Sequence, residues 1–341
     1  MRISKERILT EAASTGFRPE IFEKVAQIFS LLQGIWRHPF LKNRLVLKGG
    51  TALNLFILDV PRLSVDIDLN YIGGPDKETM LAERTKLNNA ITAVCQREGF
   101  MLRESPSEHA GGKWLLRYES AFGQGANLTI DVNFMFRIPL WPVALLNSRQ
   151  VGSYLAEDIP VLDINELAAG KLCALLSRQT ARDLFDAHLL LTGKMLDKKR
   201  LRLSFVVYGA LNRKDWRTIS AEDIGYNANE FMNELIPVLR ANKFKNDRDR
   251  KTWALRMVDE CRKAASIVLP LRKGEREFLE RILDDGEIIP SLLTKDKDMA
   301  DRILNHPGLQ WKALNVREFR NTRNKKTGGS DLESCQNAGL I

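Results

Sequence analysis

The stretch at residues 62–69, RLSVDIDL, constrains the fold of this chain more than any other segment. Its polar and apolar residues alternate, and a period of two predicts a β-strand with one buried face. Ser64, Asp66 and Asp68 then share the polar face, because strand residues two apart point to the same side. Two neighbouring carboxylates repel each other unless a cation lies between them. We therefore predict a strand that carries a metal site, the alternative being a solvated edge strand with two acids that bind nothing.

A second acidic strand is predicted at residues 127–134, where Asp131 stands on the polar side of the run NLTIDVNF. Phosphoryl transfer assisted by metal ions uses carboxylates to hold the ions or to activate the attacking hydroxyl. Such oxygen ligands suit Mg²⁺ or Mn²⁺. Asp131 is therefore predicted to join Asp66 and Asp68 as a metal ligand, the alternative being a lone surface acid.

A glycine-containing turn links a predicted strand to a predicted helix and consists of Lys48, Gly49, Gly50 and Thr51. Glycines at such a turn let backbone N–H groups approach a phosphate, and the following helix start carries partial positive charge. Thr51 would add a hydroxyl donor. The turn is therefore a candidate nucleotide-binding element, although a glycine pair before a helix is more often only a tight turn.

The predicted elements divide the chain into an α/β half and a helical half. In the first half, strands are expected at 44–47, 62–69, 114–119 and 127–134, and helices at 20–35, 51–56 and 77–97. In the second half, helices are expected at 164–178, 181–192, 197–212, 229–240, 251–266, 274–284 and 296–305. The predicted fold class is α/β. A small mixed-sheet domain covers residues 1–155, a mostly α-helical domain covers 156–316, and a disordered tail covers 317–341.

The first helix of the second half places a lysine, Lys171, among apolar neighbours. Its amine either reaches solvent beside the core or faces the carboxylates across a cleft, where it would neutralise phosphate charge. Asp163 and Glu166 have the spacing of a capping box at the start of this helix.

The next helix carries the sequence Arg-Asp-x-x-Asp. Arg182 and Asp186 are four residues apart and can pair across one helical turn. They form either a local ion pair or part of a site, and Asp183 is the better functional candidate.

Charge and composition bear on the partners of the chain. Its 341 residues include 52 Lys and Arg against 43 Asp and Glu, a formal net charge of +9. This excess suits RNA, although surplus surface lysine explains it equally well. The four cysteines form no CxxC pair, which predicts neither a zinc site nor disulfides. With no signal peptide and no apolar run long enough to span a bilayer, we expect a cytoplasmic protein without a membrane partner.

Taken together, these motifs resemble the polymerase-β nucleotidyltransferase superfamily. More closely, Lys48-Gly49-Gly50-Thr51-Ala52-Leu53 followed by Arg62-x-Ser64-x-Asp66-Ile67-Asp68-Leu69 resembles the AbiEii/AbiGii family of nucleotidyltransferase toxins. The helical lysine and the Arg-Asp-x-x-Asp signature within residues 166–186 agree with that family, as do residues 278–313. The resemblance covers roughly residues 40–315.

The resemblance implies a metal-dependent enzyme that transfers a nucleotide from a nucleoside triphosphate. It further implies an RNA acceptor, foremost the 3′ acceptor end of tRNA, whose modification blocks translation. Ser64, Asp66 and Asp68 match the catalytic motif, and Lys171 matches a lysine that holds triphosphate oxygens. Asp183 matches the acid of the Arg-Asp pair, and its neighbour Arg182 is assigned to nucleotide binding. A cognate antitoxin protein is implied as partner, in a toxin–antitoxin or abortive-infection system.

Two other functions fit the same sequence. A catalytically inactive protein of this fold would serve as an RNA- or protein-binding module, which the intact set of carboxylates disfavours. A small-molecule nucleotidyltransferase would share the superfamily motifs, but the basic charge and the helical second half favour RNA.

Overall fold

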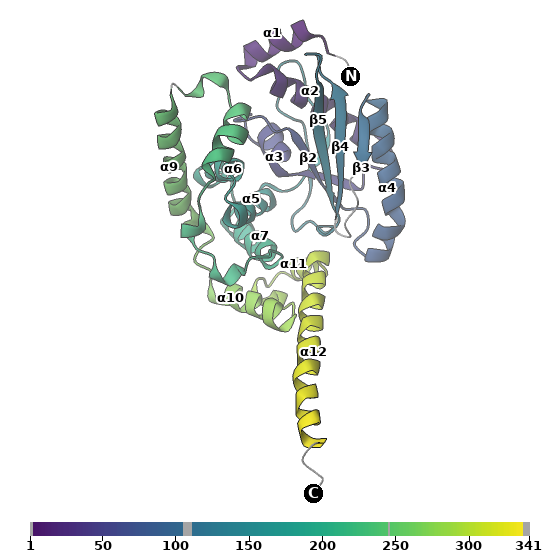
Figure 1. The fold of residues 1–341 in the computed structure, drawn as a ribbon, viewed down its shortest axis with the longest axis vertical. Helices are drawn as coiled ribbons and strands as arrows, with labels where there is room; N and C mark the ends of the chain where they lie inside the picture. Colours follow the sequence, from purple (N-terminus) through teal and green to yellow (C-terminus); the bar gives the residue numbers. More distant parts are fainter. Residues whose placement is uncertain (1–2, 105–110, 245, 337–341) are drawn as a thin grey trace.

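The computed structural model describes residues 3–104, 111–244 and 246–336. Two N-terminal helices, α1 (Lys5–Thr15) and α2 (Pro19–Arg37), precede the first strand. The long helix α4 (Lys77–Arg97) has Asp76 as its N-cap, and it shares one hydrophobic core with α2 and the strands. Figure 1 shows the sheet between α4 and the helices of the second half.

The described residues form one mixed sheet with the strand order β3-β4-β5-β2-β1-β7-β6. The strands are β1 (Leu45–Lys48), β2 (Asp66–Tyr71), β3 (Met101–Glu104), β4 (Gly111–Glu119), β5 (Gly125–Asn133), β6 (Ala144–Leu146) and β7 (Ile159–Val161). β2 runs parallel to β5, and β1 runs parallel to β7, whereas the other neighbours are antiparallel. The predicted α/β class with a mixed sheet is confirmed.

The acidic strand starts later than its alternating sequence predicted. β2 begins at Asp66 rather than Arg62 and continues to Tyr71. The preceding segment leaves the sheet because Leu63 donates its N–H to the carbonyl of Val238 in the helical half. Alternation therefore identified the correct face, but a contact distant in sequence set the start of the strand.

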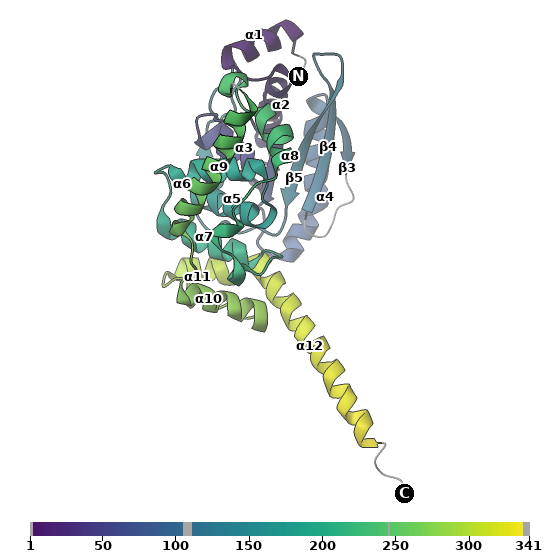
Figure 2. The same cartoon turned by 60° about the vertical axis from the view of Figure 1, so that its left-hand side comes forward.

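The helical half builds a second hydrophobic core, which meets the first near residue 167. Its main helices are α5 (Ile164–Arg178), α6 (Ala181–Thr192), α7 (Lys198–Ala210), α9 (Asp247–Ala264), α10 (Lys273–Glu280), α11 (Lys297–Leu304) and α12 (Pro307–Gln336). The helix expected at 229–240 is broken into short turns, because Pro237 cannot continue the backbone hydrogen bonds. Figure 2 shows the helical half against the sheet, on the side away from α4.

The segment from Arg317, predicted to be disordered, is helical as far as Gln336, within α12. Its first turns are anchored: Arg317 donates to the carbonyl of Gly286, and Arg320 pairs with Asp285. These contacts join the start of this segment to residues 285–286. Figure 1 shows α12 extending away from the rest of the molecule.

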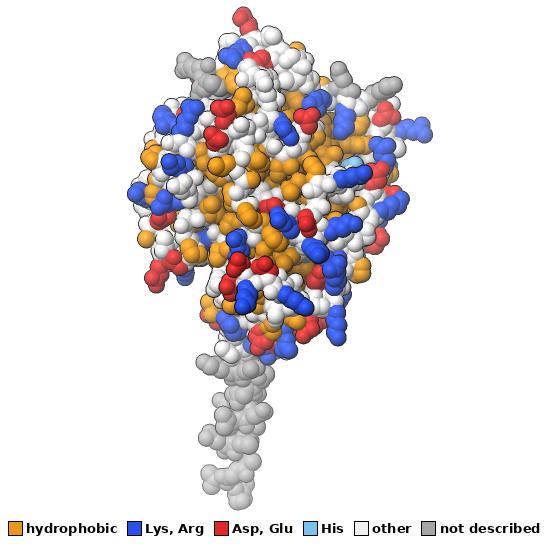
Figure 3. Space-filling view, turned by 180° about the vertical axis from the view of Figure 1, so that it is seen from behind, with side chains coloured by type: hydrophobic (Ala, Val, Ile, Leu, Met, Phe, Trp, Pro, Cys, Tyr) orange, Lys and Arg blue, Asp and Glu red, His pale blue; other side chains and the backbone are white. Residues whose placement is uncertain are grey.

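The surface of the molecule is not uniformly polar. Seen from behind, apolar side chains gather across the middle of the face, and charged side chains surround them (Figure 3). Among the described residues, no helix has both the length and the apolar character needed to cross a membrane.

Candidate active site

Asp68 and Asp131 lie side by side on the sheet. They are register partners on the parallel strands β2 and β5. On the next strand outward on each side, Lys48 of β1 pairs with Asp68, and Lys113 of β4 pairs with Asp131. Register partners share a face of the sheet. The strands therefore present a row of two carboxylates flanked by two lysines, called the carboxylate row below.

Burial and mutual repulsion act on these acids. Burial raises the pKa of Asp131; Lys48 lowers it, but Asp68 raises it again. The pKa of Asp66 is also raised, first by burial and further by Asp68, against the opposing effect of Arg182. Acids that hold their protons more tightly than usual lack sufficient neutralisation from the protein.

A glycine makes room for one carboxylate. Gly49 has a φ of +72°, and a Cβ placed there would lie 2.1 Å from Oδ2 of Asp68. Any other residue would push the carboxylate out of the row. A Cβ on Gly50 would lie 2.8 Å from Nη2 of Arg62 and 2.9 Å from Oγ of Ser64. The glycine pair is therefore required for close packing around the site.

Thr51 and Ser64 are buried behind the row. The Thr51 hydroxyl donates to the backbone carbonyl of Asp66. Thr51 is fully buried and Ser64 is nearly so. The hydroxyl donor expected from Thr51 is thus already used to hold β2 against the glycine turn.

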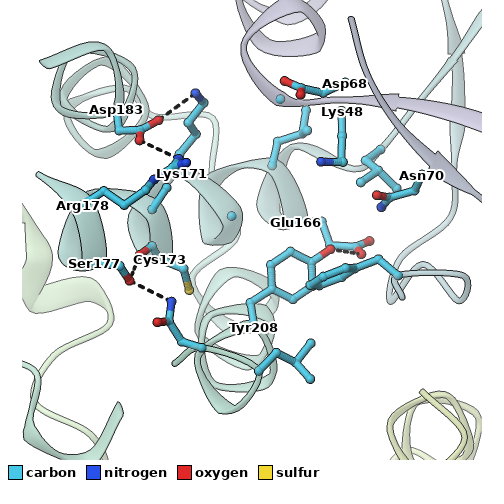
Figure 4. A pocket seen from close by; sticks show the side chains of 18 of the residues that line it. Lys48, Asp68, Asn70, Glu166, Lys171, Cys173, Ser177, Arg178, Asp183 and Tyr208 are labelled. Atoms are coloured by element: carbon cyan, nitrogen blue, oxygen red, sulfur yellow. Dashed lines mark hydrogen bonds and ion pairs between the residues drawn. The ribbon is translucent and has the colours of Figure 1, made fainter. Parts of the chain in front are cut away.

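The carboxylate row opens into a cavity of about 830 Å³ between the sheet and helices α5, α6 and α7 (Figure 4). This volume falls in the range of ligand pockets. The predicted site residues that line it are Lys48, Gly49, Asp68, Asp131, Lys171 and Asp183. The predicted site residues that lie outside its wall are Gly50, Thr51, Ser64, Asp66 and Arg182.

An ion network contributes Lys171, Arg178 and Asp183 to another wall of the cavity. Nζ of Lys171 lies 3.0 Å from Oδ1 of Asp183 and 2.8 Å from Oδ2 of Asp186. Arg62 binds Asp186 through two hydrogen bonds, of 2.8 and 2.6 Å. Nη2 of Arg178 lies 3.0 Å from Oδ2 of Asp183. We call these five residues the buried network, in which Arg178 is the exposed member. The network joins the segment before β2 to α5 and α6.

The charges of the buried network neutralise one another. Burial would raise the pKa of Asp186, but Arg62 and Lys171 hold it far below its ordinary value. Burial alone would lower the pKa of Lys171, yet Asp186 and Asp183 hold it above normal. Lys171 is therefore a charged amine fixed in place by two carboxylates.

Of the two alternatives for Arg182 and Asp186, the local ion pair between them does not form. Asp186 points inward to Arg62 and Lys171, whereas Arg182 points outward. The Arg182 guanidinium lies 2.8 Å from Glu234 and 3.7 Å from Asp66. It therefore holds Asp66, the acid of the motif that does not reach the cavity.

Within the described part of the chain, no three His, Cys, Asp or Glu side chains are arranged as ready-made metal ligands. Asp68 and Asp131 nevertheless offer the oxygen donors that Mg²⁺ prefers, in a row where a cation would relieve repulsion. The donor chemistry fits a divalent ion held by these two acids together with substrate phosphates.

Glu166 and Tyr208 form a second buried pair that sequence reasoning missed. The Tyr208 hydroxyl donates to Oε1 of Glu166 over 2.7 Å, and burial raises the pKa of Glu166 to about 7. The predicted capping box does not form, because Asp163 caps the N–H of Asn165 while Glu166 turns inward. Phe136 packs edge-on against Tyr208, with 4.8 Å between ring centres, so the cavity also has an aromatic wall.

The family model for the AbiEii nucleotidyl transferase toxins of type IV toxin–antitoxin systems matches residues 30–281. The chain belongs to this family. The resemblance read from the motifs is thereby confirmed, and the family is one of nucleotidyl transferases. No curated protein matches the chain.

Two solved structures are similar to this chain. MenT4, a nucleotidyltransferase toxin from Mycobacterium tuberculosis H37Rv, is similar with a TM-score of 0.53 and 17% identity, covering 91% of this chain and 99% of that one. JHP933 from Helicobacter pylori matches with a TM-score of 0.44 and 16% identity, covering 74% and 94%. The fold shared with MenT4 covers nearly the whole chain.

Proposed function

We propose that this toxin transfers a nucleotide from a nucleoside triphosphate to a hydroxyl of RNA, foremost the 3′ end of tRNA, and so blocks translation. The observation that carries the proposal is the register pairing of Asp68 with Asp131 at the mouth of a cavity lined by basic residues. A divalent ion, Mg²⁺ or Mn²⁺, would supply charge neutralisation for the transferred phosphate.

The acidic residues have distinct parts in this proposal. Asp68 and Asp131 would hold the ion, with Asp66 next to them on the same strand face. Asp131 lies beside Lys113, at the side of the row that faces β4 and β3. In this proposal it is therefore the acid nearest to the incoming hydroxyl. Ser64 supports the glycine turn from behind and needs no contact with substrate.

The triphosphate would bind to cations that come from different elements. Lys48 ends β1, Lys171 projects from α5, and Arg178 ends that helix, and all three line the cavity. Asp183 and Asp186 fix the amine of Lys171. A positioned cation stabilises developing charge better than a mobile one, since nothing need reorganise during the reaction.

The RNA acceptor and the antitoxin belong to the same proposal. A formal charge of +9 supports a polyanionic acceptor over a small neutral one. Membership of a type IV toxin–antitoxin family implies a cognate antitoxin protein as partner.

The test incubates the purified protein with Mg²⁺, total RNA and each α-labelled nucleoside triphosphate in turn. We expect label to enter tRNA and to be absent with Asp68→Asn. A parallel panel of small hydroxyl compounds tests the alternative acceptor class. Label in the small molecules alone would contradict an RNA acceptor, and label in neither would favour a binding module.

A further inference from the structure

The face of the sheet that carries the carboxylate row continues, exposed, beyond Asp131. Along β4, the exposed residues Lys113, Leu115 and Arg117 alternate with buried ones. Lys113 is the register partner of Asp131, Leu115 that of Thr129, and Arg117 that of Asn127. These side chains therefore lie on the same face as the carboxylates.

This face combines exposed cations with exposed apolar groups. Leu115 is 40% exposed, and Met101, the register partner of Arg117 on β3, is 65% exposed. A hollow of about 340 Å³ is lined by Met101, Leu102, Leu115, Arg117 and Asn127. Among the described residues, neither Lys113 nor Arg117 forms an ion pair. We call Met101, Lys113, Leu115, Arg117 and Asn127 the β4 platform.

Arg117 is held in a defined place. A Cβ on Gly125 would lie 2.9 Å from Nη2 of Arg117, 3.0 Å from Nε and 3.3 Å from Cζ. The guanidinium thus lies across the bare backbone of β5, with its donors available to a ligand. Arg117 is four residues from Lys113, about 13 Å along the strand. The two cations are spaced for successive contacts with an extended polyanion.

We propose that the β4 platform binds the single-stranded end of the RNA acceptor and leads its terminal hydroxyl to Asp131. This inference rests on the proposed function. Unpaired nucleotides expose both phosphates and base faces, which match the cations and the apolar side chains of the platform. A duplex hides its base faces and would use only the cations.

The charge arm of the test measures binding, which does not depend on transfer. A fluorescent single-stranded RNA of twelve nucleotides is titrated with the full-length protein at several salt concentrations. With Lys113→Ala/Arg117→Ala, we expect roughly tenfold weaker binding and a salt slope smaller by about 1.4, at about 0.7 per lost phosphate contact. The matched control is Lys295→Ala/Lys297→Ala, two exposed lysines in the helical half, which should bind like wild type.

The apolar arm uses Leu115→Ser. We expect weaker RNA binding with an unchanged salt slope, since no charge is lost. Triphosphate binding and melting temperature should match wild type in Leu115→Ser, because Leu115 is exposed and lies outside the carboxylate row.

The outcomes separate this inference from the proposed function. Platform variants that bind single-stranded RNA like wild type overturn the platform, whether or not RNA is labelled. A blunt RNA duplex bound as tightly as the single strand overturns the preference for unpaired nucleotides. If wild type labels no RNA with any triphosphate, the proposed function fails, and weakened binding by the variants still supports the platform.

Discussion

Two walls of the cavity each contain a pair of carboxylates, although Asp186 lies behind the cavity surface, and the two pairs differ in how they are neutralised. Asp183 and Asp186 are surrounded by cations of the chain, and the pKa of each is lowered despite burial. Asp131 of the carboxylate row instead has a raised pKa, because burial and Asp68 outweigh its lysines. The difference suggests that the buried network serves structure and positioning, while the carboxylate row is built to receive a cation.

The largest effect should come from the carboxylate row. Asp68→Asn or Asp131→Asn removes a proposed metal ligand and should lower nucleotide transfer by roughly 10³-fold or more. The melting temperature should stay the same or rise slightly, because like-charge repulsion is lost. Transfer assays with Mg²⁺ and thermal melts measure both. Normal transfer by either variant would remove the row from the mechanism.

In the buried network, the main effect of removing a carboxylate should be on stability rather than on transfer. Asp186→Asn should destabilise the fold by about 3–5 kcal/mol, since Arg62 would keep a buried charge without a carboxylate partner and Lys171 would keep only Asp183. Urea unfolding gives the loss. The control is Asp259→Asn, which breaks an exposed pair with Lys263 and should change stability little. If both variants lose equally little stability, the burial of Asp186 does not determine how much its ion pairs contribute to stability.

Lys171 belongs to the buried network and also lines the cavity, so its removal should affect both stability and transfer, each to a smaller extent. Lys171→Met keeps the apolar stem but leaves Asp183 and Asp186 with one cation fewer each. We expect a loss of stability of about 1–3 kcal/mol and a higher KM for the triphosphate. Steady-state kinetics over a range of triphosphate concentrations measure the second effect. An unchanged KM with a large thermal loss would make Lys171 purely structural.

The smallest effect concerns how stability depends on pH. Ionisation of Asp131 destabilises the native state, whereas ionisation of Asp186 stabilises it, so the two acids act on this dependence with opposite sign. The raised pKa of Asp131 means that its charged form destabilises the native state, and this cost vanishes as the pH falls through that pKa. The excess stability of Asp131→Asn over wild type should therefore shrink between neutral and acidic pH. Stability from Asp186 is present above its ordinary pKa and is lost only in stronger acid. Melting curves of wild type and Asp131→Asn from pH 7 to pH 4 measure the difference in stability between these two proteins. A difference that stays constant over this range would contradict the prediction.

Local patterns predicted one wall of the cavity better than the other. Asp68 and Asp131 were identified because alternation within a single strand fixes which side chains share a face. The buried network depends on Arg62 meeting Asp186, 124 residues later, and no periodicity encodes that contact. Spacing along the helix offered Arg182 as a possible partner of Asp186, because the two residues are four apart. Glu166 was read as a cap because only packing against Tyr208 reveals its inward orientation.

The short strands at the edges were missed for a related reason. β6 and β7 have three residues each, too few for a pattern to stand out. β3 is held by pairing with β4 rather than by its own sequence. The family resemblance, rather than any local pattern, assigned motifs of the α/β half and of the helical half to one site.

Calorimetric titration with Mn²⁺ tests most directly whether the carboxylate row, and not the buried network, binds a metal ion. Wild type, Asp68→Asn, Asp131→Asn and Asp186→Asn are titrated under identical conditions, at a temperature where all four are folded. We predict that wild type and Asp186→Asn bind the ion, whereas Asp68→Asn and Asp131→Asn do not. Binding by the two row variants as tight as that of wild type would contradict the assignment of the carboxylate row as the metal site.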